Sequence, residues 1–187
     1  MIADVVGSTA IGEQLGPERS KLLIDEVMRL LAEHVRRYEG TVAQLVGDEM
    51  LAFFGAPVSH EDDSERAVRA ALAIQRAVQA YAEEVKDAYG IDLAVRIGIN
   101  TGPVVAGVIG QTKFSYDVWG ETVNTAWHME TYGAPGHIQV NETTYARLRD
   151  KYLFEDRGEF FVKDKGELRT YFLKGRKQIP AVMRQGS

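Results

Sequence analysis

The stretch TVAQLVGDEMLAFF, residues 41–54, decides the fold of this 187-residue chain. Two apolar runs, 41–46 and 50–54, flank the three residues Gly47, Asp48 and Glu49. Runs of this length on either side of a short, glycine-containing turn are typical of a β-hairpin. The stretch therefore predicts two neighbouring antiparallel strands with an aspartate at the turn between them.

Working outward, the segments on both sides of this hairpin follow one order of elements. A short strand over 1–5 leads through a turn at 7–9 into a long amphipathic helix over 17–38. After the hairpin, a second long helix over about 62–89 precedes a strand over 93–100. This order predicts an α+β fold with a ferredoxin-like βαββαβ core, an antiparallel sheet with both helices on one face.

That topology has a consequence for two aspartates. The end of the first strand neighbours the start of the third, so we expect Asp4 and Asp48 to lie side by side. Two carboxylates converging at strand ends suit Mg²⁺, which takes its other oxygens from water and from substrate phosphates. The plainer interpretation, that each aspartate is only a turn residue, has comparable support from spacing alone.

The rest of the chain predicts a C-terminal α/β extension. Further strands are expected over 104–109, 114–118 and 137–140, with a helix after the second of them, a helix over 141–150 and a final pair of strands that ends at Leu173. We expect a domain over 1–175 whose first strand is cut short, followed by a frayed tail over 176–187.

Composition excludes several classes of function. The net charge is −5 with no basic stripe, so we expect no nucleic-acid partner. No cysteine is present, which excludes disulfides and thiolate chemistry. No apolar run approaches the roughly 20 residues that a bilayer requires, and the first residues lack the basic region typical of a signal peptide. We therefore expect a cytoplasmic domain without membrane contact.

A possible phosphate contact lies beside Asp4. The segment from Val5 through Val6, Gly7 and Ser8 to Thr9 offers backbone N–H groups and a helix N-terminus to a triphosphate. It is not a Walker P-loop, because no GxxxxGK[ST] occurs in the chain.

Five segments in order carry a family resemblance: ADVVGST (3–9), VGDEMLAFFG (46–55), VRIGINTG (95–102), YDVWGETVN (116–124) and KDKGELRTYFL (163–173). Together they resemble the catalytic domain of class III adenylyl and guanylyl cyclases, of the bacterial adenylate cyclase type. The resemblance implies conversion of ATP to 3′,5′-cyclic AMP and pyrophosphate by in-line attack of the ribose 3′-hydroxyl. It covers nearly the whole chain.

The resemblance also implies a metal and phosphate site. Asp4, Asp48 and the backbone carbonyl of Val5 match the ligands of two ions, Mg²⁺ or Mn²⁺, in each active site. Arg96 matches an arginine that neutralises the terminal phosphates, and Lys163 matches a lysine that reaches the same phosphates from the partner chain. The plainer interpretation of both cations is a solvated strand residue.

Base recognition falls on two matching positions. Asp117 matches the acceptor of the adenine amino group, and its carboxylate would oppose the O6 of guanine. Adenylyl cyclases usually carry lysine at the position of Gln44, whose amide still donates to adenine N1 but without charge. We expect a modest preference for ATP over GTP.

The helix of the extension departs from the family at one position. Asn124 matches the asparagine that orients the ribose and the reacting phosphate. One turn later the family places an arginine against the charge that develops on the α-phosphate, where this chain has His128. Because an arginine contact of this kind accounts for about 10³ to 10⁵ in rate, we expect a slow enzyme that mild acid helps. The alternative is that His128 is only a helix residue.

In this family the metal aspartates of one subunit face the base-reading residues of the other, so the resemblance implies a homodimer with shared sites. Trp119, or Phe53 and Phe54, are candidates for that interface, and a core role for the phenylalanines is as well supported. We expect regulatory domains to lie outside this chain, in a longer protein. Two alternatives stay open: an ATP-binding pseudo-cyclase that acts as a dimerisation module, and a diguanylate cyclase, which the 116–124 run disfavours.

Overall fold

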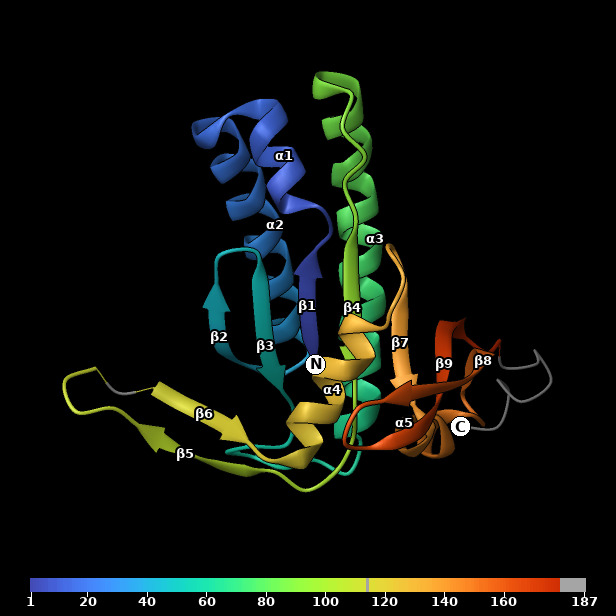
Figure 1. The fold of residues 1–187 in the computed structure, drawn as a ribbon. Helices are drawn as coiled ribbons and strands as arrows, with labels where there is room; N and C mark the ends of the chain where they lie inside the picture. Colours follow the sequence, from blue (N-terminus) through green and yellow to red (C-terminus); the bar gives the residue numbers. More distant parts are fainter. Residues whose placement is uncertain (114, 179–187) are drawn as a thin grey trace, which may run out of the picture.

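The computed structural model describes residues 1–113 and 115–178 and contains a seven-stranded sheet in the order β2-β3-β1-β4-β7-β9-β8 (Figure 1). Its strands are β1 (Ile2–Val5), β2 (Thr41–Val46), β3 (Glu49–Phe53), β4 (Val95–Ile99), β7 (Ile138–Asn141), β8 (Tyr152–Val162) and β9 (Gly166–Arg176). A separate two-stranded sheet pairs β5 (Val105–Ile109) with β6 (Ser115–Trp119). The helices are α1 (Ser8–Leu15), α2 (Pro17–Arg37), α3 (Asp63–Tyr89), α4 (Glu121–Thr131) and α5 (Glu142–Leu148).

The two faces of the large sheet pack against different helices. Side chains alternate along a strand, so Ala3 and Val5 of β1 join the main core with the apolar stripes of α2 and α3. Ile2, on the other face, packs in a second cluster with Val118 of β6 and Ala126 of α4. Because Asp4 shares the face of Ile2, its carboxylate lies on the α4 side of the sheet.

The βαββαβ core is confirmed. β1 pairs antiparallel with both β3 and β4, and α2 and α3 share one face, as the order of elements predicted. The extension adds β7 parallel to β4, so the complete sheet is mixed. The strands β5 and β6 do not join it, and they extend to one side of the molecule in Figure 1.

Several predicted boundaries were wrong. The turn expected at 7–9 is the start of α1, because Gly7 adopts a left-handed φ of 68° and ends the turn before Ser8. The last strand continues to Arg176 rather than Leu173. Residues 179–187 of the predicted tail lie outside the described part of the chain, as does Phe114 of the strand predicted over 114–118. Among the described residues, every helix is too short or too polar to cross a bilayer.

The close approach of α4 to β4 depends on Gly98. A Cβ built there would lie 2.2 Å from the backbone nitrogen of Glu130 and 2.6 Å from the carbonyl oxygen of Ala126. Since both contacts are helix backbone, α4 would have to move as a unit. Gly98 therefore sets the distance between the sheet and the helix that carries Asn124 and His128.

We expect Gly98→Ala to lower the free energy of unfolding by ~1–3 kcal/mol, as overpacking does in other cores. Urea denaturation measures this. Gly107→Ala is the matched control, because its added Cβ would meet the Trp119 ring at 3.5 Å, an ordinary van der Waals distance. A Gly98→Ala protein as stable as the control would show that α4 tolerates displacement from β4.

Candidate active site

The acidic half of the site forms where β1 ends beside the β2–β3 turn. The backbone N–H of Val5 donates to the carbonyl oxygen of Asp48 at 3.0 Å, and Asp4 is in register with Glu49. The predicted adjacency of Asp4 and Asp48 is therefore present. Gly47, with a φ of 61°, allows the chain to turn at this point without strain.

Four carboxylates lie close to one another here, and one arginine pairs with two of them. Arg96 places Nη2 3.1 Å from Oδ2 of Asp4, and its Nε is 3.0 Å from Oε1 of Glu130. Burial, with the nearby charge of Asp48, raises the pKa of Asp4 despite Arg96. Burial and the charges of Asp4, Glu130 and Asp48 likewise raise the pKa of Glu49. One arginine does not balance this cluster.

The cluster fits the predicted divalent cations. Excess negative charge on half-buried carboxylates is what a bound Mg²⁺ or Mn²⁺ would offset. Within residues 1–113 and 115–178, no three His, Cys, Asp or Glu side chains converge as a closed ligand set. Two protein carboxylates with open positions suit a cation that shares its coordination with substrate phosphates. Asp4, Asp48 and the carbonyl of Val5 thus remain the predicted ligands.

The phosphate-facing segment needs one correction. The N–H of Val6 donates to the carbonyl oxygen of Ala94 at 2.9 Å, so it is not free for a phosphate in this conformation. The first turn of α1, with Ser8 and Thr9, presents N–H groups that the helix itself leaves unpaired. The Ser8 hydroxyl donates to Oδ2 of Asp48, which ties this helix start to the acidic cluster.

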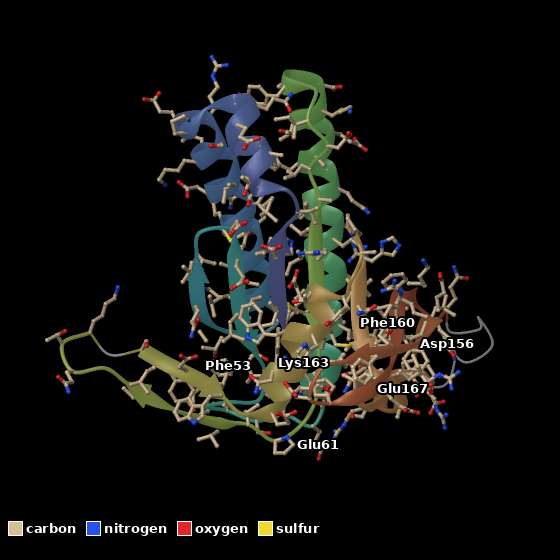
Figure 2. All side chains as sticks on the ribbon, viewed as in Figure 1. Phe53, Glu61, Asp156, Phe160, Lys163 and Glu167 are labelled. Carbon is tan, nitrogen blue, oxygen red and sulfur yellow. The ribbon has the colours of Figure 1, made fainter. Side chains whose placement is uncertain are left out.

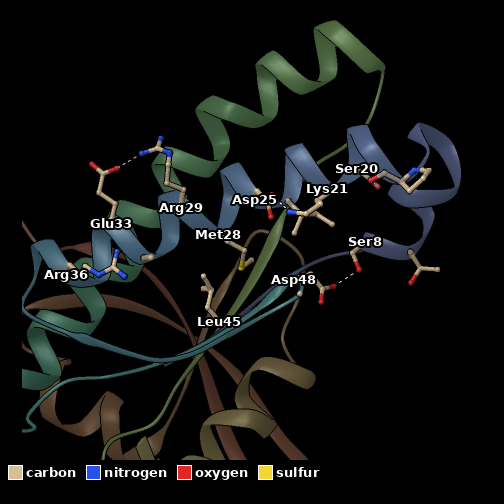
Figure 3. A pocket seen from close by; sticks show the side chains of 15 residues that line it. Ser8, Ser20, Lys21, Asp25, Met28, Arg29, Glu33, Arg36, Leu45 and Asp48 are labelled. Atoms are coloured by element: carbon tan, nitrogen blue, oxygen red, sulfur yellow. Dashed lines mark hydrogen bonds and ion pairs between the residues drawn. The ribbon is translucent and has the colours of Figure 1, made fainter. Parts of the chain in front are cut away.

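A cavity of about 1060 Å³ adjoins this half between α2 and the β2–β3 hairpin. Figure 3 shows its wall on α2, where Met28 and Arg29 lie, and its far end at Ser8 and Asp48. It reaches neither Arg96 nor the predicted base-reading residues. The cavity therefore does not form a complete nucleotide site within one chain.

The base-reading half is assembled elsewhere, where β2 meets β6. Nε2 of Gln44 donates to Oδ2 of Asp117 at 2.9 Å, and Oδ1 of Asp117 accepts the N–H of Val118 at 2.8 Å. Asp117 is only 7% exposed, whereas Gln44 is exposed. The two residues predicted to read the base thus touch each other, 73 positions apart in sequence.

Helix α4 carries the remaining predicted residues. Asn124 is exposed on the first turn of the helix, and His128 is partly buried one turn later. Burial, followed by the positive charge of Lys165, lowers the pKa of His128, and Glu121 opposes this shift in part. The imidazole is therefore mainly neutral at pH 7, so mild acid charges it less readily than predicted.

The predicted position of Lys163 on a late strand was wrong. It is exposed in the tight turn that joins β8 to β9, beside α4 in Figure 2. The sequence interpretation missed Lys165, two residues later, whose Nζ lies 2.9 Å from Oγ1 of Thr125 on α4. Its only signal was a second lysine in the motif KDKG.

The predicted interface aromatics differ in exposure. Trp119 is 44% exposed on β6, and three apolar residues of β5 are at least as exposed: Val105, Val108 and Ile109. Phe53 is only 7% exposed and packs in the core, so it does not supply a free interface surface. An exposed apolar hairpin of this kind is a candidate surface for contact with another protein chain.

Comparison with known proteins identifies the family and the fold to which this chain is similar. The model of the family "Adenylate and Guanylate cyclase catalytic domain" matches residues 1–175. An adenylate cyclase of Mycobacterium tuberculosis is 35% identical over 177 residues, which are 95% of this chain and 39% of that relative. The chain therefore spans about two fifths of the length of that protein.

Two solved structures are similar as well. An adenylyl cyclase from P. aeruginosa matches with a TM-score of 0.88 and 27% identity, over 95% of this chain and 93% of the other. The guanylate cyclase domain from Catenaria anguillulae, solved in complex with GTP, matches with a TM-score of 0.83 and 30% identity over 94% of both chains. Relatives with either nucleotide specificity thus share this fold.

Proposed function

The chain belongs to the adenylate and guanylate cyclase catalytic domain family, and from that premise we propose that it is an adenylate cyclase that acts as a homodimer. The reaction forms a bond between the ribose O3′ and the α-phosphorus of ATP. It breaks the bond from that phosphorus to the oxygen bridging the β-phosphate. Pyrophosphate leaves with the electron pair, and the 3′-hydroxyl proton passes to water.

The contact between Gln44 and Asp117 is the observation that supports ATP rather than GTP as the substrate. Adenine presents an amino donor at N6 and an acceptor at N1. The Asp117 carboxylate accepts from N6, while the Gln44 amide, held with its nitrogen toward Asp117, has a second N–H for N1. Guanine presents O6 to the same carboxylate and an N–H to the same donor, so both contacts oppose it.

Each residue of the acidic half has a role in this proposal. Asp4, Asp48 and the carbonyl of Val5 would hold Mg²⁺ or Mn²⁺, which supplies activation of the 3′-hydroxyl and charge neutralisation on the triphosphate when bound. Arg96, now paired with Asp4 and Glu130, neutralises terminal phosphates. The start of α1 adds N–H donors from Ser8 and Thr9.

The other half belongs to the partner subunit and acts on the base, the ribose and the phosphates of the nucleotide. Asn124 orients the ribose and the α-phosphate, and Lys163, exposed in its turn, reaches the terminal phosphates. The exposed apolar hairpin of β5 and β6 supports a dimer that brings the two halves together. Because His128 is a neutral donor where the family has arginine, we propose a slow enzyme.

The direct test is product formation from ATP and from GTP with Mn²⁺. We expect cyclic AMP and pyrophosphate in equal amounts, with kcat/KM about tenfold higher for ATP than for GTP, a difference of ~1.4 kcal/mol. The margin is modest because Gln44 carries no charge and is exposed. A preference for GTP would overturn the substrate assignment, and ATP binding without cyclic product would favour the pseudo-cyclase alternative.

A further inference from the structure

The helix α4 lacks the expected cation at position 128, yet a different cation lies against the same stripe of this helix. Glu121, Thr125 and His128 follow one another at spacings of four and three, which places them on one face of α4. Lys165 contacts the first two, and its charge also acts on the third. The lysine therefore lies along the stripe that ends at His128.

Lys165 is fixed in this place rather than solvated. Its side chain is only 13% exposed, its Nζ lies 2.9 Å from Oγ1 of Thr125, and it forms an ion pair with Glu121. The turn that carries it is tight, since Asp164 adopts a left-handed φ of 68°. Lysine is usually among the most exposed residue types, so this degree of burial against one helix is informative.

We propose that Lys165 supplies, at the α-phosphate, the positive charge that His128 does not. This inference rests on the proposed cyclase function. The Lys165 ammonium contacts Thr125, which lies within one helical turn of both Asn124 and His128, the residues proposed to face the reacting phosphate. A cation that meets charge developing in the transition state acts mainly on kcat.

In the nucleotide-free chain Lys165 pairs with Glu121, and a phosphate can readily replace this carboxylate. Glu121 is 74% exposed, so its carboxylate returns to water at little cost when a phosphate oxygen takes its place. Thr125 is buried and continues to hold the ammonium by its hydroxyl. The lysine therefore exchanges one anion for another without leaving its position.

The test is a double-mutant cycle on the homodimer, with ATP and Mn²⁺. Lys165→Met is expected to lower kcat about 100-fold while KM changes less than about threefold, the range found for loss of one preorganised donor. Lys165→Arg retains the charge and is expected to stay within about tenfold of the wild type. His128→Arg raises kcat about 10- to 100-fold in the wild type, but several hundredfold in the Lys165→Met background, because there it replaces the missing cation.

A lysine with only a structural role would give a different pattern of kcat values in this cycle. If Lys165 only anchored the hairpin turn, His128→Arg would raise kcat by the same factor in both backgrounds. Lys174→Met is the matched control, since it removes an ion pair with Glu155 from the same hairpin away from α4, and it should leave kcat unchanged. Melting temperatures of all variants separate lost folding from lost catalysis.

The outcomes separate this inference from the function on which it rests. A wild type that forms no cyclic product overturns both. An active wild type whose Lys165→Met variant keeps its kcat, or whose cycle is additive, overturns only the role of Lys165.

Discussion

Asp48→Asn is expected to lower cyclase turnover by a factor of about 10³ or more, the largest single loss among the variants considered. The substitution preserves size and the backbone contact between Val5 and Asp48, but it removes one of the two carboxylates predicted to hold the cations. The Ser8 hydroxyl can still donate to the remaining amide oxygen. Excess Mn²⁺ is expected to restore little of this loss, because the amide lacks the charge of the ligand.

The fold of Asp48→Asn is expected to be intact. Asp48 adds negative charge to a cluster in which the pKa values of Asp4 and Glu49 are already raised. Removing that charge relieves repulsion, so the melting temperature should stay the same or rise. An inactive variant that melts at or above the wild-type temperature therefore assigns the loss to chemistry.

The matched control is Asp156→Asn, the same isosteric change at an exposed ion pair with Arg169 on the β8–β9 hairpin. Steady-state assays of cyclic AMP at several Mn²⁺ concentrations are expected to show wild-type turnover for this control. If Asp48→Asn retained more than a tenth of wild-type turnover at saturating Mn²⁺, Asp48 would not be a metal ligand in this protein.

The fold and the acidic half were largely predictable from the sequence because local patterns determine them. The helix α2 follows a 3.6-residue apolar period, and the hairpin around Gly47 follows from its turn residues. Once the order of elements is known, topology alone brings Asp4 and Asp48 together. None of these steps requires knowing how side chains pack.

The rest of the fold and of the candidate site depends on tertiary contacts that no local sequence pattern encodes. The helix α1 is short and includes Gly12, so its propensity is weak, and the burial of Ile11 and packing on α2 stabilise it. Lys165 reaches α4 because the β8–β9 turn folds back on this helix, across 40 residues of sequence. Burial first, and then the charge of this lysine, lower the pKa of His128. Such contacts become visible only in three dimensions.

The second large effect is complementation between two inactive chains. Asp48→Asn and Asn124→Ala are each expected to be nearly inactive as homodimers, yet active when co-expressed. The physical reason is that, in the proposed homodimer, the acidic half of one chain completes its site with Asn124 of the partner subunit. Glu130 contacts the acidic half through Arg96, and Asn124 lies six residues earlier on α4, about 9 Å back along the helix axis at 1.5 Å per residue.

A dimer of the two variants therefore contains one site with both defects and one intact site. Random pairing of equal amounts makes half of the dimers mixed, and half of their sites are intact, so about a quarter of the wild-type specific activity is expected. The rise over either homodimer would be at least about 100-fold if each variant alone keeps less than a few thousandths of the wild-type rate.

The control places both substitutions on one chain. Co-expression of the double variant Asp48→Asn/Asn124→Ala with Asp48→Asn yields no intact site, because every site then lacks Asp48, and it should remain inactive. Activity of the complementing pair should also fall on dilution, as dimers that share their sites dissociate. Suppose that a preparation of Asp48→Asn with Asn124→Ala contains mixed dimers, as shown by size and mass, but recovers no activity. Each chain would then complete its own site. The exposed apolar surface of β5 and β6 would then need another explanation.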